Sequence, residues 1–149
     1  MSWREAVVVA AHAFYDVLCR HPHALPILAA RVPVGPGGLR AREWLGGLLL
    51  SHGFPVPLAA RAFTAIGHYV IGFAIQQHSP GTPGPEDQVR LRDYYRSLDP
   101  ATYPATTAVA DELTSVPPHE EFGFGLNLLL DGLERAARQR LTPGLPHPL

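Results

Sequence analysis

One stretch near the end of the chain, Glu120 to Leu141, constrains the fold more than any other. Its apolar residues recur at spacings of three and four, which is the period of an amphipathic helix. These residues are Phe122, Leu126, Leu129, Leu130 and Leu133. Acidic residues open the stretch and arginines close it, and both favour a helix because they complement its dipole. We therefore predict one long helix over residues 120–141.

Two glycines, Gly125 and Gly132, lie seven residues apart and so fall on nearly one line of this helix. Each costs about 1 kcal/mol relative to alanine inside a helix, which suggests that another backbone comes close there. Phe124 and Leu128 widen the apolar stripe beyond what one small core requires. We predict that the helix packs on its own domain on one side and on a second subunit on the other. The alternative is an ordinary core helix with two tolerated glycines.

A second long apolar segment runs from Pro57 to about His78. Its apolar residues cover more than half of a helix circumference, and they are Leu58, Ala62, Phe63, Ile66, Tyr69, Val70, Phe73 and Ala74. A helix that is apolar so far around is enclosed between two partners. Gly67 and Gly72 are expected to allow the close approach of a neighbouring element. We predict that this helix and the one at 120–141 meet their own copies across a symmetry axis.

Prolines, 16 in number, divide the rest of the chain into shorter blocks with helical periodicity. Ser2 and Glu5 form a capping box, which predicts a helix that begins at once and ends before Pro22. Its expected inner face is Trp3, Val7, Ala10, Phe14, Val17 and Leu18. Further helices are expected over 23–30, 39–52, 87–97 and 103–115, with loops over 31–38 and 79–86 and a frayed tail over 141–149. No segment alternates as strands do, so the sequence predicts one all-α domain, 1–149, with about seven helices.

Composition limits the class of protein. The net charge is −1, so nothing indicates nucleic acid or acidic lipid as a direct partner of this segment. The apolar runs are shorter than a membrane span, and we expect no membrane partner. The single cysteine, Cys19, excludes an internal disulfide and fits a cytoplasmic protein.

The sequence contains no catalytic or metal motif. Eight histidines are present, but no HExxH or CxxC spacing indicates a metal site, and no GxSxG indicates a nucleophile. We therefore expect no catalysis, no metal and no cofactor. His68 is the histidine of most interest, either as a hydrogen-bonded core or interface residue or as a contact to a ligand. A small helical enzyme that uses His68 is a further alternative, and it requires a second titratable group within reach.

Residues from four predicted helices are candidates to line a pocket. They are Phe14, Leu28, Leu45, Leu48, Phe63, Thr64 and Ile71. The polar groups expected there are few, namely Arg31, Thr64 and His68. This composition is typical of a small-molecule site, but it equally fits a packed core, because periodicity cannot separate the two.

Three blocks of the sequence match one known family in order and at the right spacing. They are Ser2 to Glu5 with Phe14 and the Arg31–Pro33 turn, then Gly53-Phe54 with GHYVIGFAIQQ at Gly67 to Gln77, and finally FGFGLNLLLDGLERAARQRL at 122–141. These blocks resemble the C-terminal domain of the tetracycline repressor (TetR) family. The resemblance implies an all-helical domain that binds a small effector and dimerises, with helices 57–78 and 120–141 of two subunits forming a four-helix bundle. It also implies that a ligand between the first helix, the 31–38 turn, the third helix and the long helix alters the spacing of the DNA-reading helices.

The resemblance has two departures. The family's N-terminal helix-turn-helix domain is absent, so we expect DNA binding only through that missing domain, whether the chain is an excised domain or a standalone protein. The magnesium–tetracycline site is not kept, because Leu28, Gln76 and Ala10 stand where the resemblance implies a metal-binding histidine, a carboxylate and an asparagine. Phe14, Pro33 and His68 match the family. We expect an apolar or aromatic effector and no metal.

These arguments together predict the ligand-binding and dimerisation domain of a TetR-family repressor, with a small-molecule effector and a second copy of itself as partners. The alternative is a dimerisation module without a pocket. The predicted ligand-binding residues are Phe14, Leu28, Arg31, Pro33, Leu45, Leu48, Phe63, Thr64, His68 and Ile71. The predicted interface residues are Tyr69, Phe73, Phe122, Gly125, Leu126, Leu129, Gly132 and Leu133.

Overall fold

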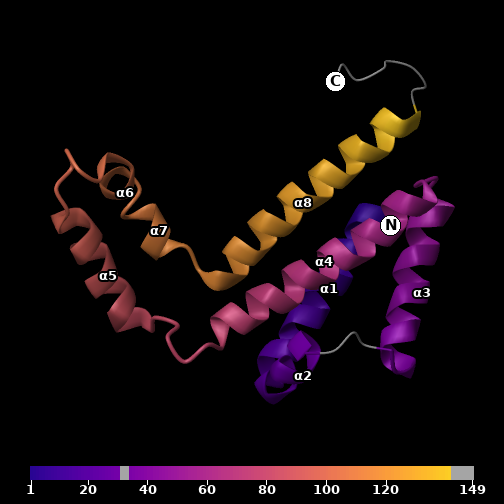
Figure 1. Cartoon of the computed structure of the whole chain (residues 1–149), viewed down its shortest axis with the longest axis horizontal. Coiled ribbons are helices and arrows are strands. Elements are labelled where there is room, and N and C mark those ends of the chain that lie inside the picture. Colours follow the sequence, from indigo (N-terminus) through magenta and orange to yellow (C-terminus); the bar gives the residue numbers. More distant parts are fainter. Residues whose placement is uncertain (31–33, 142–149) are drawn as a thin grey trace.

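The structure, a computed structural model, describes residues 1–30 and 34–141. Within these residues the chain forms eight α-helices and one short 3₁₀ helix, η1, and it forms no strand (Figure 1). The elements are α1 (Trp3–Arg20), η1 (Pro22–Ala24), α2 (Leu25–Ala30), α3 (Pro36–Ser51), α4 (Val56–Gln77), α5 (Pro85–Ser97), α6 (Pro104–Ala108), α7 (Glu112–Ser115) and α8 (Pro118–Leu141). The predicted all-α class is confirmed. The predicted tail lies outside the described residues, apart from its first position at the end of α8.

Local sequence signals account for several helix ends. The Ser2 hydroxyl accepts a hydrogen bond from the backbone N–H of Glu5 at 3.2 Å, and the Glu5 carboxylate accepts one from the Ser2 N–H at 2.7 Å. The two bonds complete the predicted capping box at the start of α1, and hydrogen bonding from the Ser2 backbone and side chain lowers the pKa of the Glu5 carboxyl. Gly53 ends the turn after α3 with φ of +80°, a conformation that favours glycine. The third helix begins at Pro36, three residues before the expected start at Leu39, because proline is well suited to the first helical turn.

The core lies among five helices, α1, α2, α3, α4 and α8. We call these five helices the body. Its centre is Phe122 of α8, whose side chain is 0% exposed. Tyr15 of α1 stacks on this ring with centroids 4.5 Å apart, and Tyr69 and Phe73 of α4 lie 5.3 and 5.4 Å from it. Burial raises the pKa of the Tyr15 and Tyr69 phenols. Small residues on α4, Ala59, Ala62 and Ala74, allow α1, α3 and α8 to pack closely around it.

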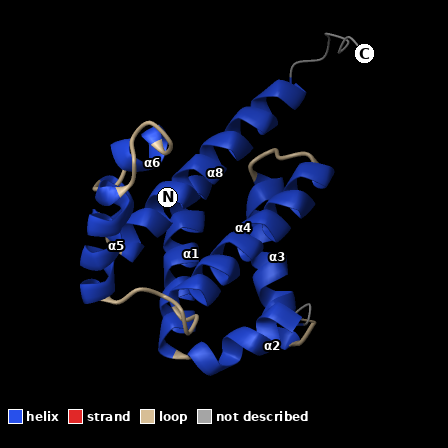
Figure 2. Ribbon diagram, turned by 60° about the vertical axis from the view of Figure 1, so that its left-hand side comes forward, coloured by secondary structure: helices blue, strands red, loops and turns tan. Residues whose placement is uncertain are grey.

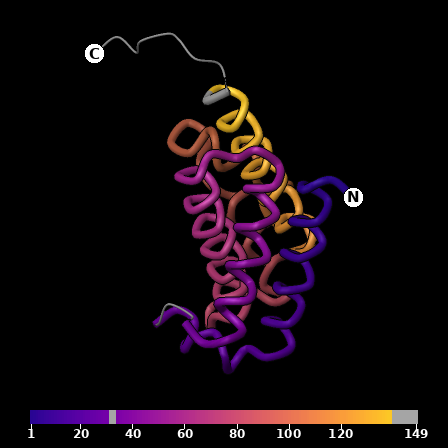
Figure 3. The backbone as a smooth tube through the Cα atoms, turned by 90° about the vertical axis from the view of Figure 1, so that its right-hand side faces the viewer, coloured from indigo at the N-terminus to yellow at the C-terminus, as the bar shows by residue number. Residues whose placement is uncertain are grey.

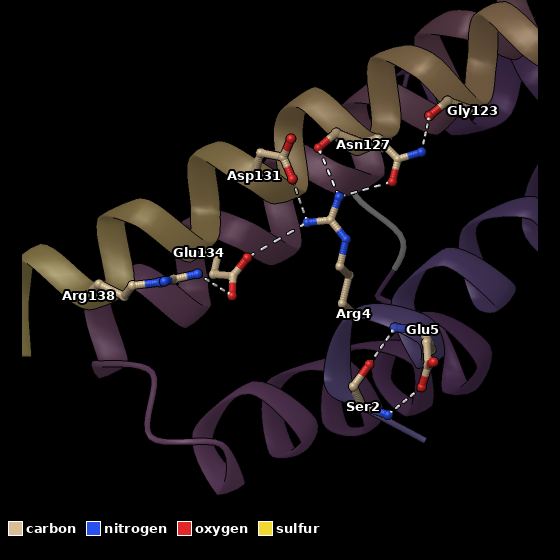
Figure 4. A network of polar contacts seen from close by, with 8 residues as sticks. All are labelled: Ser2, Arg4, Glu5, Gly123, Asn127, Asp131, Glu134 and Arg138. Atoms are coloured by element: carbon tan, nitrogen blue, oxygen red, sulfur yellow. Dashed lines mark hydrogen bonds and ion pairs between the residues drawn. The ribbon is translucent and has the colours of Figure 1, made fainter.

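A polar network at the surface ties the start of α1 to α8 (Figure 4). Arg4 pairs with Asp131 at 2.7 Å and donates to the side-chain oxygen of Asn127 at 3.0 Å. Asn127 in turn donates to the Gly123 carbonyl at 2.9 Å, and Glu134 pairs with Arg138 at 2.6 Å. This network and the aromatic cluster around Phe122 join the first and last helices of the body.

Helices α5, α6 and α7 form an arm that projects from the body beyond the ends of α4 and α8 (Figure 1). Their main contacts are with one another, and Figure 2 shows α5 and α6 grouped at one side of the chain. Among the described residues of the arm, 85–115, only Ala110 is buried.

The structure corrects the single helix predicted over 103–115, which is divided into α6 and α7. The backbone leaves helical geometry at Val109, so Ala110 turns inward and is 1% exposed. Asp111 then meets Arg96 of α5 at 2.7 Å. The helix pattern continued through this turn in the sequence, and only the packing of α7 on α5 reveals the break.

The inner face predicted for α1 is displaced by about one residue. Phe14 and Val17 are 38% and 41% exposed, whereas Tyr15 is buried beside Phe122. The buried stripe is Ala6, Val7, Ala11, Tyr15 and Leu18. Because α1 packs on both α4 and α8, the position of the stripe depends on two neighbours that one helix pattern does not locate.

The apolar runs were expected to be shorter than a membrane span. Helix α4 differs from this expectation, because by length and composition alone it is long and apolar enough to cross a membrane. A core helix passes the same test, and α4 contacts α1, α2, α3 and α8. Only 28% of its most apolar window is buried within the chain, so apolar residues also lie on faces that the body leaves open.

Candidate functional site

Three neighbouring cavities lie in the body. The largest of the three lies between α1, α2, α3 and α4 and has a volume of about 640 Å³. Figure 3 shows α1, α3 and α4 running side by side along the body. The lining residues with larger side chains are Phe14, Leu28, Arg42, Phe63, Thr64, His68 and Ile71. The remaining walls are glycines and alanines, so much of this space is left open by small residues.

Two smaller cavities adjoin the largest one. A cavity of about 160 Å³ reaches towards the core at Val7, Leu45 and Ile66, and it shares Phe14, Ala41, Phe63 and Gly67 with the largest cavity. A groove of about 420 Å³ lies on the far side of Arg42, Phe63 and Thr64, between α3 and the start of α4. Phe63 borders all three spaces, so its ring is the common wall of the site.

The structure brings most of the predicted pocket residues together. Phe14, Leu28, Phe63, Thr64, His68 and Ile71 line the largest cavity, and Leu45 lines the smaller one. Leu48 packs against the core and borders none of the three spaces. Arg31 and Pro33 lie outside the described residues.

Two important lining residues, Arg42 and Gly67, were not among the predicted contacts. Nothing in the sequence distinguishes Arg42 from the other arginines of the chain. Gly67 was expected to allow helices to approach, but a side-chain carbon placed there meets nothing within 4 Å. Gly67 therefore leaves open space on the cavity side of α4. The sequence GHYVI from Gly67 to Ile71 does place three lining residues on one helix, but so short a pattern does not identify a pocket.

The polar side chains that line the cavity are few, and none of those described is acidic. Thr64 donates to the Ala60 carbonyl at 3.3 Å, which is a bond within its own helix. Arg42 lies over the Phe63 ring with its guanidinium carbon 5.4 Å from the centroid. Among the described residues no carboxylate lines the cavity, and no cluster of three or more metal-ligating side chains occurs. The arrangement suits a binding site for a largely apolar molecule.

The residues predicted for a subunit interface divide into two groups. Phe122, Leu126 and Leu133 are buried in the chain's own core and offer no surface to a partner, which corrects their expected role. Gly125 faces Tyr69 of the same chain, because an added side-chain carbon there would lie 2.4 Å from the Tyr69 hydroxyl. That hydroxyl donates to the Phe122 carbonyl at 2.8 Å, so Gly125 makes room for an intrachain contact.

The outward side of α8 remains open. Phe124 and Leu128 are 67% and 55% exposed, and Gly132 is exposed with nothing near it. Leu128 and Gly132 follow Gly125 at helical spacing, so they continue the line that meets Tyr69 of α4. Tyr69, Phe73 and Leu129 are partly buried beside this surface.

Comparison with known proteins identifies the family. The family model described as "Tetracyclin repressor-like, C-terminal domain" matches residues 1–137. The chain belongs to the TetR family. The resemblance drawn from the three sequence blocks is thereby confirmed, and TetR-family relatives that are transcriptional repressors indicate a regulator rather than an enzyme.

Individual relatives agree with this assignment. The TetR domain is 28% identical over 153 residues to the HTH-type transcriptional repressor DrrR1 of Streptomyces coeruleorubidus, covering 97% of this chain and 56% of that protein. It is similar to the solved structure of ActR from Streptomyces coelicolor in complex with actinorhodin, with a TM-score of 0.82, 30% identity, and coverage of 91% of this chain and 65% of that one. Another TetR regulator of Streptomyces coelicolor matches with a TM-score of 0.80, 29% identity, and coverage of 92% of this chain and 68% of that one. The chain thus spans about half the length of the curated repressor that it matches.

Proposed function

We propose that this TetR domain binds a small apolar or aromatic effector and forms a homodimer in a cytoplasmic repressor. Effector binding would relieve DNA binding by a helix-turn-helix domain of the full-length protein. The observation that carries the proposal is the cavity of about 640 Å³ between α1, α2, α3 and α4, lined mainly by apolar side chains.

The chemistry of the cavity supports the effector class. A ligand that fills it would be stabilised mainly by buried apolar surface, at roughly 25 cal/mol per Å². Leu28 lines the wall where the family resemblance implies a metal-binding histidine, and this favours a metal-free effector. ActR, a relative of similar fold, has been solved with actinorhodin and with (S)-DNPA, which supports small-molecule binding by this domain type.

The alternatives have less support. A dimerisation module with a collapsed pocket would leave no space near Phe14, Leu45 and Phe63, but all three border open cavities. An enzyme that uses His68 would need a titratable partner for that ring. Among the described residues no hydrogen bond or ion pair joins His68 to another titratable side chain.

Exposed apolar surface supports the homodimer. The open face of α8 at Phe124, Leu128 and Gly132 lies beside Tyr69 and Phe73 of α4, and this is where we place the intersubunit contact. The arm adds further exposed apolar side chains, including Tyr94 and Leu113. A second copy covering these faces would remove them from water, as a closed dimer requires.

Gly67→Leu tests the effector site directly, because the added side chain enters the open space without meeting backbone. The probe is N-phenyl-1-naphthylamine, a neutral fluorescent aromatic molecule. We expect the wild-type chain to bind about one probe per chain with enhanced fluorescence, and Gly67→Leu to weaken binding at least about tenfold, because the leucine occupies the same apolar space.

Gly47→Leu is the matched control, because Gly47 is exposed on α3, borders none of the three spaces and also has nothing within 4 Å. It should bind the probe as wild type does. Equal binding by wild type and Gly67→Leu would contradict the proposed site. Calorimetric detection of magnesium-dependent tetracycline binding would contradict the metal-free assignment.

A further inference from the structure

The guanidinium of Arg42 occupies an unusual place in the cavity wall. Arg42 belongs to α3 and borders both the largest cavity and the adjoining groove. Its Nε atom is buried and has no hydrogen-bond partner, and among the described residues the side chain forms no ion pair. A buried donor without a partner is unfavourable, so such a group in a native site calls for an explanation.

The surroundings of Arg42 hold the group ready for a ligand. Its guanidinium lies over the Phe63 ring, and this cation–π contact holds the cation against the cavity wall. The other described lining residues carry no negative charge that would neutralise it. A planar guanidinium presents parallel N–H donors that match the two oxygens of a carboxylate.

The first turn of α3 adds positive potential at the same place. Gly37 and Gly38 line the cavity, and Arg42 lies four residues beyond Gly38 on the same side of the helix. No side chain caps this helix end, and the first N–H groups of a helix have no partner within it. The helix dipole therefore favours negative charge in the part of the cavity that Gly37 and Gly38 line.

We propose that Arg42 anchors an anionic oxygen group, such as a carboxylate, on the effector. The inference rests on the proposed function and narrows its ligand class from any apolar aromatic molecule to an aromatic acid. The ring system would occupy the apolar walls at Phe14, Leu28 and Ile71, and the acid group would pair with the Arg42 guanidinium where it borders the cavity.

Two matched probes, 2-naphthoate and the neutral 2-naphthalenemethanol, test this proposal by titration calorimetry on the whole chain. We expect wild type to bind the acid about tenfold more tightly than the alcohol, which is the scale of a charged hydrogen bond in a partly buried site. Arg42→Met keeps the apolar stem but removes the charge, so it should abolish this preference while leaving alcohol binding within about twofold. Arg42→Lys keeps the charge without the planar fork and should retain about a third of the preference.

Arg40→Met is the control, because Arg40 is exposed on the same helix and borders none of the three spaces. It should behave as wild type, and unchanged alcohol binding by Arg42→Met verifies that this variant is folded. Equal affinity of wild type for both probes would overturn the role of Arg42 but leave the pocket intact. Failure of both probes to bind at millimolar concentration would overturn the pocket and the anchor together.

Discussion

The body and the arm of this TetR domain are stabilised in different ways. In the body, apolar side chains from five helices are buried around Phe122, and no polar or charged residue of the described chain is fully buried. In the arm, α5, α6 and α7 bury only Ala110 and are joined by exposed polar contacts, of which Arg96 to Asp111 at 2.7 Å is the shortest ion pair. The arm also exposes Tyr94 and Leu113 at 59% and 61%.

This difference implies that the contacts within the arm stabilise it less than apolar burial stabilises the body. Exposed ion pairs contribute about 0–1 kcal/mol each, which is too little to order some 30 residues against their conformational entropy. The body has enough buried surface for its own stability, whereas the arm should gain order when a second subunit covers its apolar side chains.

Replacing one apolar side chain in each region should give the largest difference in the free energy of unfolding. Phe122→Ala should lower the free energy of unfolding by about 3–5 kcal/mol, because it leaves a cavity among Tyr15, Tyr69 and Phe73. Leu113→Ala in the arm should change the stability of a single chain by less than about 0.5 kcal/mol. Urea denaturation measured at low protein concentration gives both values.

At high protein concentration the same two variants should differ in a second way. The effect of Phe122→Ala should persist, whereas the effect of Leu113→Ala should grow with concentration if a partner covers the arm. An effect of Leu113→Ala that is large and independent of concentration would mean that the arm is packed within its own chain.

Alanine at either of two glycines of α8 should change the stability by a smaller amount. The two glycines differ in what surrounds them. Gly125→Ala pushes against the Tyr69 hydroxyl, and the strain of about 1–3 kcal/mol should exceed the gain in helix propensity of about 1 kcal/mol. Gly132→Ala meets nothing and should stabilise the single chain by about 1 kcal/mol. Thermal unfolding of both variants measures the contrast.

Sedimentation of the same variants examines the subunit contact. Weaker association of Gly132→Ala would show that Gly132 lies where two subunits approach closely, as its place in the sequence suggested. Adding Tyr69→Phe to Gly125→Ala should recover part of the lost stability, since the clash with the hydroxyl is removed. If the double variant recovered none of the lost stability, the destabilisation of Gly125→Ala would have a cause other than the Tyr69 hydroxyl.

The smallest expected effect is a pH response confined to the arm. The hydrogen bond from Arg96 lowers the pKa of Asp111 below its ordinary value of 3.8, and the backbone of Ala101 and hydroxyl of Thr102 lower that of Asp99. A carboxyl group with a lowered pKa stabilises the arm at pH values above its unfolded-state pKa. This stabilisation is lost as the pH falls through its folded-state pKa.

Hydrogen exchange should therefore show arm amides losing protection as the pH falls below about 4, before those around Phe122. Arg96→Met should raise the pKa of Asp111 towards its ordinary value in a carboxyl NMR titration. An unchanged Asp111 titration in this variant would show that the ion pair is not formed in solution.

Helix positions and the family were predictable from the sequence because they depend on local patterns. The capping box at Ser2, the glycine after α3 and the long apolar periodicities of α4 and α8 all indicate structure within a few residues of themselves. Six of the predicted pocket residues also line one cavity, because helical spacing placed them on faces that converge.

The division of those faces between core, cavity and open surface depends on how the helices pack together. Periodicity treats Phe122 and Phe124 alike, yet one is buried and the other exposed, because neighbouring helices cover only one side of α8. It likewise predicts Gly67 as a packing residue and gives no signal for Arg42, whereas both border the same open space. The sequence determined which segments are helices and which residues are apolar, but burial depends on distant helices that meet only in the folded chain.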